Sequence, residues 1–136
     1  MNTLNQLKKA TVISLIVALI VCLGTLQNAQ AVSPPPDGGY PGGNTAEGQS
    51  ALFSLSTGGF NTAVGFFSLR SDTAGAFNTA VGAVALFANT DSDNTAIGAE
   101  ALLNNTAGSD DTAVGFQALV SNTIGLSNTA IGSAAL

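Results

Sequence analysis

Four aspartates toward the carboxyl end of the chain are of the residue type that calcium sites use. Asp91 and Asp93 fall in one turn-like segment, and Asp110 and Asp111 fall in the next. Carboxylate oxygens are hard ligands that suit Ca²⁺, but the Gly-Gly-x-Gly-x-Asp pattern of calcium-binding rolls is absent from the sequence. We therefore interpret the four side chains as solvated acidic turns that cluster along one edge, with calcium binding as the alternative.

Paired carboxylates are also the groups that cleave glycosidic bonds. A sugar-binding cleft needs aromatic walls, however, and the chain has no Trp and one Tyr. With no His and one Cys, the chain cannot form a Ser-His-Asp triad, a Cys-His pair or a Cys/His zinc site. We therefore expect a protein that is not an enzyme and that holds no metal or cofactor.

Threonine offers a third surface chemistry, because flat arrays of Thr on a solenoid can order water and bind ice. The recurring threonines are Thr45, Thr62, Thr79, Thr95, Thr112 and Thr129. Thr also favours strands, and its hydroxyl can satisfy a turn. No Thr-x-Thr pair falls within one expected strand, so we favour a structural role and keep ice binding as an alternative.

These residues recur because the chain repeats itself over residues 44–136. The unit has 17 residues, or 16 in one case, and typically begins N-T-A-V/I-G-x-x-A-L. Its second, third, fifth and ninth positions are Thr, Ala, Gly and Leu in all six units. Seventeen residues are too few for a pair of helices, and Gly and Asn are poor helix formers. The period instead predicts two short strands and two turns per unit.

We therefore predict an all-β fold, a parallel β-roll or β-solenoid in which each unit forms one coil, with five full coils and a partial sixth. Two ladders of aliphatic side chains are expected to fill the narrow interior. The first ladder comprises Leu52, Leu69, Leu86, Leu102, Leu119 and Leu136. The second comprises Val64, Val81, Ile97, Val114 and Ile131. A glycine column, which we expect to mark positive φ or close backbone approach, comprises Gly48, Gly65, Gly82, Gly98, Gly115 and Gly132.

Two other features of the unit predict how the coils are held. The Asn at the first position is expected to form a side-chain ladder along the stack, as amides do in cross-β assemblies. The chain also has seven Phe at variable positions, which are too many to hide inside so narrow a coil. We therefore expect one face of the rod to pack against copies of itself.

Residues 1–31 have the three parts of a secretory signal peptide. Lys8 and Lys9 precede an apolar run over residues 11–23, and small residues end the segment at Ala31. The run is shorter than the ~20 residues that a membrane-spanning helix needs. We expect cleavage after Ala31, with an uncleaved anchor as the alternative. The protein is then secreted or held at the cell surface, and its repeats make no membrane contact.

A Pro- and Gly-rich linker over residues 32–43 joins this segment to the repeats. All eight acidic residues and a single base, Arg70, follow residue 31. So acidic a chain is not expected to bind nucleic acid or anionic lipid through charge. We expect Arg70 and Tyr40 to be solvated, and Cys22 to be an apolar filler of the removed segment.

The units NTAVGFFSL, NTAVGAVAL, NTAIGAEAL, DTAVGFQAL and NTAIGSAAL resemble the head repeats of trimeric autotransporter adhesins, which form a YadA-like left-handed parallel β-roll. They are also similar to the repeat arrays of phage tail-fibre-like proteins, which often end in an intramolecular chaperone domain. The resemblance covers residues 44–136. It implies a homotrimer of side-by-side rolls at the outer membrane surface that adheres to a host matrix protein or a glycan. A tail-fibre segment is the alternative. The chain shows no stalk, anchor barrel or chaperone domain, so we expect it to be a fragment.

Overall fold

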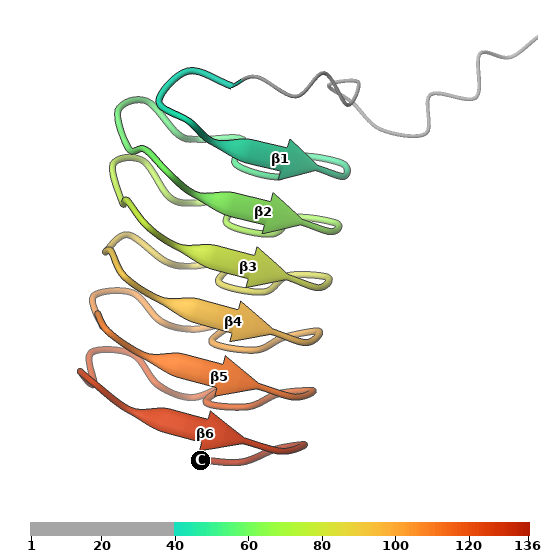
Figure 1. The fold of residues 1–136 in the computed structure, drawn as a ribbon. Helices are drawn as coiled ribbons and strands as arrows, with labels where there is room; N and C mark the ends of the chain where they lie inside the picture. The colour runs from blue at the N-terminus through green and yellow to red at the C-terminus, as the bar shows by residue number, and fades with distance from the viewer. Residues whose placement is uncertain (1–39) are drawn as a thin grey trace, which may run out of the picture. The chain divides into compact units, whose positions relative to one another are not determined.

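The computed structural model describes residues 40–136, so the expected signal peptide and most of the expected linker lie outside the described residues. The described chain winds into a stack of coils, one for each repeat (Figure 1). Each coil contributes one three-residue strand: β1 (Thr45–Glu47), β2 (Thr62–Val64), β3 (Thr79–Val81), β4 (Thr95–Ile97), β5 (Thr112–Val114) and β6 (Thr129–Ile131). These strands form one parallel sheet in sequence order, which confirms the predicted all-β solenoid. None of the described residues belongs to a helix that could span a membrane.

Equivalent positions of successive units lie directly opposite one another in this sheet. Ala63 pairs with Ala80, and Ala80 pairs with Ala96, although the unit between the last two is one residue shorter. The missing residue is therefore absorbed outside the strands. This register stacks each position of the unit into a column that runs the length of the rod.

The structure has one strand per coil where the sequence predicted two. The expected second strand, x-A-L-x, does not form because its backbone is not extended: φ is 52° at Val84 and 49° at Leu86. The coils still pair there, since the Leu86 N–H donates to the Ala101 carbonyl at 3.0 Å and the Val84 N–H donates to the Phe66 carbonyl at 2.8 Å. Both sides of the stack are therefore hydrogen-bonded, although only one side is a β-sheet.

Alanine and leucine fill the apolar part of the interior. The third-position Ala and the ninth-position Leu of the middle coils are completely buried, as Ala80 and Leu86 illustrate. The predicted Leu ladder is confirmed from Leu52 to Leu119. In the last coil of the structure the pattern ends, and Leu136 is 85% exposed.

The glycine column follows the strands, and both reasons expected for it are confirmed. All six of its members have φ between 122° and 137°, a range that side chains disfavour. A Cβ added to Gly98 would also lie 2.4 Å from the carbonyl oxygen of Gly115 in the next coil. Gly132 has the same φ range, but a Cβ added there would meet only the Cβ of Ala135, at 3.9 Å, because no further coil follows in the structure.

The first-position column is the predicted amide ladder. The backbone N–H of Asn78 donates to Oδ1 of Asn61 at 2.8 Å, and the N–H of Asn94 donates to Oδ1 of Asn78 at 3.0 Å. Asp111 occupies the same column, where its carboxylate accepts the N–H of Asn128 at 2.8 Å. Each of these buried side chains thus links one coil to the next.

A second buried polar column, at the twelfth position, was not foreseen from the sequence. Its fully buried members are Asp72, Asn89 and Asn105. Oδ1 of Asp72 accepts the N–H of Gly75 at 2.7 Å, which ties down the turn that follows. Burial is the main influence on this carboxyl and raises the pKa of Asp72 above its ordinary value, although hydrogen bonds oppose the shift.

Candidate interaction surface

The outer face of the β-sheet carries the Val/Ile ladder, which the sequence had placed in the interior. Val81 is 36% exposed, Ile97 is 43% exposed, and Val64 and Ile131 also face outward, while Val114 is half-buried. The reason is the two-residue alternation of a strand. Because the third-position Ala points inward, the residues on either side of it must point outward, so the expectation of two inner ladders was wrong.

The threonine column lies on the same outer face, beside the Val/Ile column. Thr62 pairs with Thr79 and Thr79 pairs with Thr95, so the hydroxyl-bearing side chains stand in register along the sheet. The Thr residues of the four inner strands are half-buried, and those of the two end strands are exposed. The sheet therefore presents parallel files of hydroxyl and aliphatic groups.

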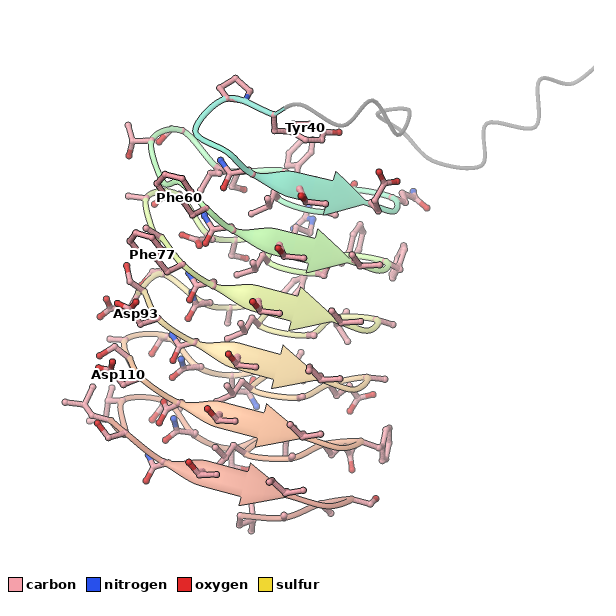
Figure 2. The ribbon with its side chains drawn as sticks, viewed as in Figure 1. Tyr40, Phe60, Phe77, Asp93 and Asp110 are labelled. Carbon is pink, nitrogen blue, oxygen red and sulfur yellow. The ribbon has the colours of Figure 1, made fainter. Side chains whose placement is uncertain are left out.

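A different edge of the rod carries the seventeenth-position column, in which two aromatic residues are followed by two acids. Phe60, Phe77, Asp93 and Asp110 lie in one file along this edge (Figure 2). The rings of Phe60 and Phe77 stack with centroids 5.2 Å apart and planes inclined by 9°. Both rings are more than half exposed, at 65% and 58%. All four residues have φ near 60°, so the backbone is left-handed at this position.

Arg70 is not the solvated edge residue that the sequence predicted. It occupies the tenth-position column between Phe53 of the preceding coil and Phe87 of the following one, and its Cζ lies 5.7 Å and 5.9 Å from their ring centroids. Phe67, in the same coil, is closer, at 4.8 Å. The planar guanidinium thus takes the place of a ring in an aromatic column.

The four aspartates, which the sequence indicated as solvated turns with calcium binding as the alternative, do not stay together, and the expectation of solvation was wrong for Asp111. Asp91, Asp93 and Asp110 are exposed in the turns, whereas Asp111 is fully buried in the amide ladder. Its carboxylate accepts hydrogen bonds from the side-chain amides of Asn122 and Asn128 instead. Residues 40–136 contain no group of three or more His, Cys, Asp or Glu that could hold a metal ion.

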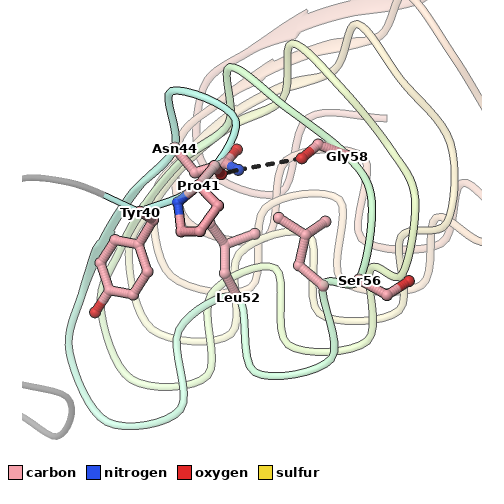
Figure 3. Close-up of a pocket in the computed structure, with 7 residues that line it drawn as sticks. Tyr40, Pro41, Asn44, Leu52, Ser56 and Gly58 are labelled. Carbon is pink, nitrogen blue, oxygen red and sulfur yellow. Dashed lines mark hydrogen bonds between the residues drawn. The ribbon is translucent and has the colours of Figure 1, made fainter.

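A small cavity of about 170 Å³ lies at the amino-terminal end of the stack (Figure 3). Tyr40, Leu52, Leu55 and Ser56 are among the residues that line it. Leu55, which lines it, holds the twelfth position, and the next three coils carry buried Asp or Asn there. Tyr40 is half-buried against the core and not solvated as expected.

Two of these features were missed from the sequence. The aromatic setting of Arg70 had a signal, since Phe53 and Phe87 stand 17 residues to either side of it. The twelfth-position polar column had one as well, in the recurrence of Asp72, Asn89 and Asn105. Both were obscured because neither position is invariant among the units.

Comparison of the chain with models of known protein families, with curated proteins and with solved structures finds no match. Over residues 40–136 the surface presents aromatic and aliphatic columns, a threonine file, three exposed aspartates and one guanidinium that lies among aromatic rings.

Proposed function

We propose that this chain is an exported, non-enzymatic structural repeat protein whose rods assemble side by side into a homotrimer at the cell surface and serve in adhesion. The fold itself, a β-solenoid, is compatible with a structural repeat protein. The observation that carries the proposal is the division between a constant interior and a variable exterior. Ala, Leu and the amide ladder repeat inside, while the tenth and seventeenth positions change from coil to coil outside.

Self-association is supported by the amount of apolar surface that the rod leaves uncovered. The large apolar side chains that are at least half exposed outside the sheet face are Phe53, Phe60, Phe77, Phe116, Ile124, Leu126 and Leu136. Exposed apolar side chains that form a contiguous patch are typical of contact with another protein, and the stacked rings of Phe60 and Phe77 are contiguous in this way. A rod also has a long side surface, against which an identical copy can pack along its whole length. Copies that pack in this way can form a closed ring.

Adhesion is supported by the resemblance of the repeat to adhesin heads and by the pattern of display. Each coil places its variable side chains at fixed intervals, with coils about 4.8 Å apart. A host matrix protein or a glycan that spans several coils would contact many of these side chains at once. The tail-fibre alternative predicts the same trimer without retention at the cell surface, so cell fractionation separates the two.

The test is to produce the full chain with its own leader in an exporting host and to recover it from the cell envelope. Mass spectrometry should find Val32 as the first residue. Light scattering should give three times the mature chain mass, with a β-type far-ultraviolet spectrum. Binding to immobilised matrix proteins or glycans should follow. A folded monomer, an intact leader or a chain retained in the cytoplasm would each contradict the corresponding part of the proposal.

Ice binding is a second candidate, favoured by the register of the threonine file on the outer sheet face. The full chain should then show thermal hysteresis, and Thr112→Leu should abolish it because a bulkier apolar group breaks the file. Thr123→Leu is the matched control, since Thr123 is exposed but lies outside the strands. Hysteresis that is absent, or that survives Thr112→Leu unchanged, would exclude this function.

A further inference from the structure

We propose that Arg70 binds the Asp93 carboxylate of a neighbouring copy of this chain, and that this ion pair fixes the register in which the rods assemble. The inference rests on the proposed side-by-side assembly, and it names the groups that hold its interface. It joins two columns of the rod, the tenth position on one copy and the seventeenth position on the next.

The guanidinium of Arg70 is surrounded by aromatic rings but has no acceptor among residues 40–136. Its Cζ lies over the rings of Phe53, Phe67 and Phe87, and its N–H groups are the donors by which it can bind an acceptor. Nε is buried and has no hydrogen-bond partner within residues 40–136. No carboxylate among the same residues forms an ion pair with Arg70. A guanidinium in this state is suited to a carboxylate, which can accept two parallel hydrogen bonds.

Asp93 is the exposed acid best placed to supply that carboxylate. Within residues 40–136 its carboxylate accepts no hydrogen bond, whereas Asp91 accepts the N–H of Ser92 and Asp110 accepts the hydroxyl of Ser109. Asp93 also follows Phe77 directly in the seventeenth-position file (Figure 2). A guanidinium that reaches Asp93 would thus meet an aromatic ring as well, which shields the ion pair from water.

The positions of Arg70 and Asp93 along the rod allow them to meet when two copies lie side by side without a shift along the rod axis. Asp93 follows Arg70 by 23 residues, so with coils spaced about 4.8 Å apart it lies roughly 6–7 Å further along the rod. The terminal N–H groups of the guanidinium and the side chain of Asp93 together can span that offset while the guanidinium keeps its place among the rings. Asp110 follows Arg70 by 40 residues and lies roughly 11 Å further along, which is out of register.

The partner is a second copy because the rest of the described chain has no cation to offer. Arg70 is the single base among residues 40–136, so Asp93 cannot be paired within its own rod. A contact between two different columns is heterologous, and a heterologous contact can close into a ring. Each copy in such a ring donates one Arg70 and accepts with one Asp93.

The experiment is a charge exchange in the full, exported chain, with oligomer dissociation measured by light scattering over a dilution series. Arg70→Glu and Asp93→Arg should each weaken the assembly about tenfold or more, which corresponds to about 1.4 kcal/mol. The double variant should restore it, because the charges are exchanged and the pair is kept. Asp110→Arg is the matched control at the same position of the next coil, and combining it with Arg70→Glu should restore nothing.

Three results would overturn the inference in distinguishable ways. If the unmodified protein is a folded monomer, the proposed assembly fails and the ion pair fails with it. If the unmodified protein assembles and both single variants assemble equally well, only the ion pair is wrong. If the single variants weaken assembly but the double variant does not recover, Arg70 and Asp93 act on different partners.

Arg70 also packs between rings, so Arg70→Glu is checked for folding by far-ultraviolet dichroism. If that variant loses its β-type spectrum, Asp93→Asn decides, because Asp93 is exposed and its neutralisation leaves the coil intact. Weaker assembly of Asp93→Asn, together with loss of the salt dependence of dissociation, supports the pair. Unchanged assembly of Asp93→Asn overturns it.

Discussion

The Leu column and the Val/Ile column both consist of aliphatic side chains, yet the Leu side chains point into the coil and the Val/Ile side chains point out of it. Leu86 is completely buried, and Val81, only five residues earlier, is 36% exposed. Val81 ends a strand, where alternation turns it away from the inward-facing Ala80. Leu86 lies in a left-handed stretch, where the coil has turned back on itself. Backbone conformation, and not hydrophobicity, therefore decides which aliphatic column becomes the core.

A column of glycines with positive φ lies in the sequence between these two columns, where each strand ends. Replacement of one of these glycines should have the largest effect on stability. Gly98→Ala should destabilise the protein by about 4 kcal/mol or more, because its Cβ would lie 2.4 Å from the Gly115 carbonyl oxygen at a φ of 135°. Urea unfolding followed by dichroism measures the loss. Gly132→Ala is the control: it has the same backbone strain but no overlap, and it should lose only about 1–3 kcal/mol. Equal losses would show that strain, and not coil contact, constrains the column.

Truncation of the inner column should have the next largest effect. Leu86→Ala should lower the free energy of unfolding by about 2–5 kcal/mol, because the side chain is completely buried between neighbouring coils. Thermal and urea unfolding both measure it. Leu136→Ala provides the contrast within the same column, since that residue is 85% exposed. A Leu86→Ala variant as stable as Leu136→Ala would mean that the ladder does not hold the coils together.

The interior also contains polar side chains, and the buried carboxyl of Asp72 shows how one of them affects the free energy of unfolding. Its raised pKa means that the folded chain holds the proton more tightly than the unfolded chain. The free energy of unfolding therefore falls as the pH rises from about 3.9, the ordinary value for Asp, through the raised value. Asp72→Asn should remove this loss and stabilise the protein at neutral pH by about 1 kcal/mol, as Asn89 and Asn105 hold the same position in the next coils.

The pH dependence of that gain distinguishes the carboxyl from its neighbours. The advantage of Asp72→Asn should shrink as the pH falls from neutral through the raised pKa of Asp72 toward about 3.9, because the protonated Asp72 no longer carries a buried charge. Melting temperatures of both proteins between pH 3 and 8 measure this. A constant difference across the range would mean that the variant acts through hydrogen bonding alone.

The solenoid could be predicted from the sequence because its main determinants are invariant. Ala80, Gly82 and Leu86 have counterparts in every unit, and each has a clear physical reason to recur. The interior is narrow at Ala80, Gly82 combines a positive φ with close backbone contact to the next coil, and Leu86 fills the interior. The amide ladder followed from the same logic. The repeat length alone is enough to predict those columns, because stacking the units in register places their invariant residues above one another.

Whether a column of side chains points into the coil or out of it could not be predicted from the repeat length alone. The sequence does not show that φ is positive at Leu86, because Leu rarely adopts that conformation. Without that knowledge the A-L block has the pattern of a second strand, and Val81 is predicted to lie inside with Leu86. The position of Arg70 was equally hidden, because its ring neighbours Phe53 and Phe87 belong to other coils.

Val81→Thr is the mildest change and the sharpest test of the outward-facing column. If Val81 faces outward, the variant should unfold within about 0.5 kcal/mol of the unmodified protein, whereas a Thr in the interior would leave a hydroxyl unsatisfied. Unfolding measured at two protein concentrations adds a second reading. If copies pack on the sheet face, Val81→Thr should reduce only the part of the stability that grows with concentration. A loss of several kcal/mol at every concentration would return Val81 to the core and reverse the assignment of the two columns.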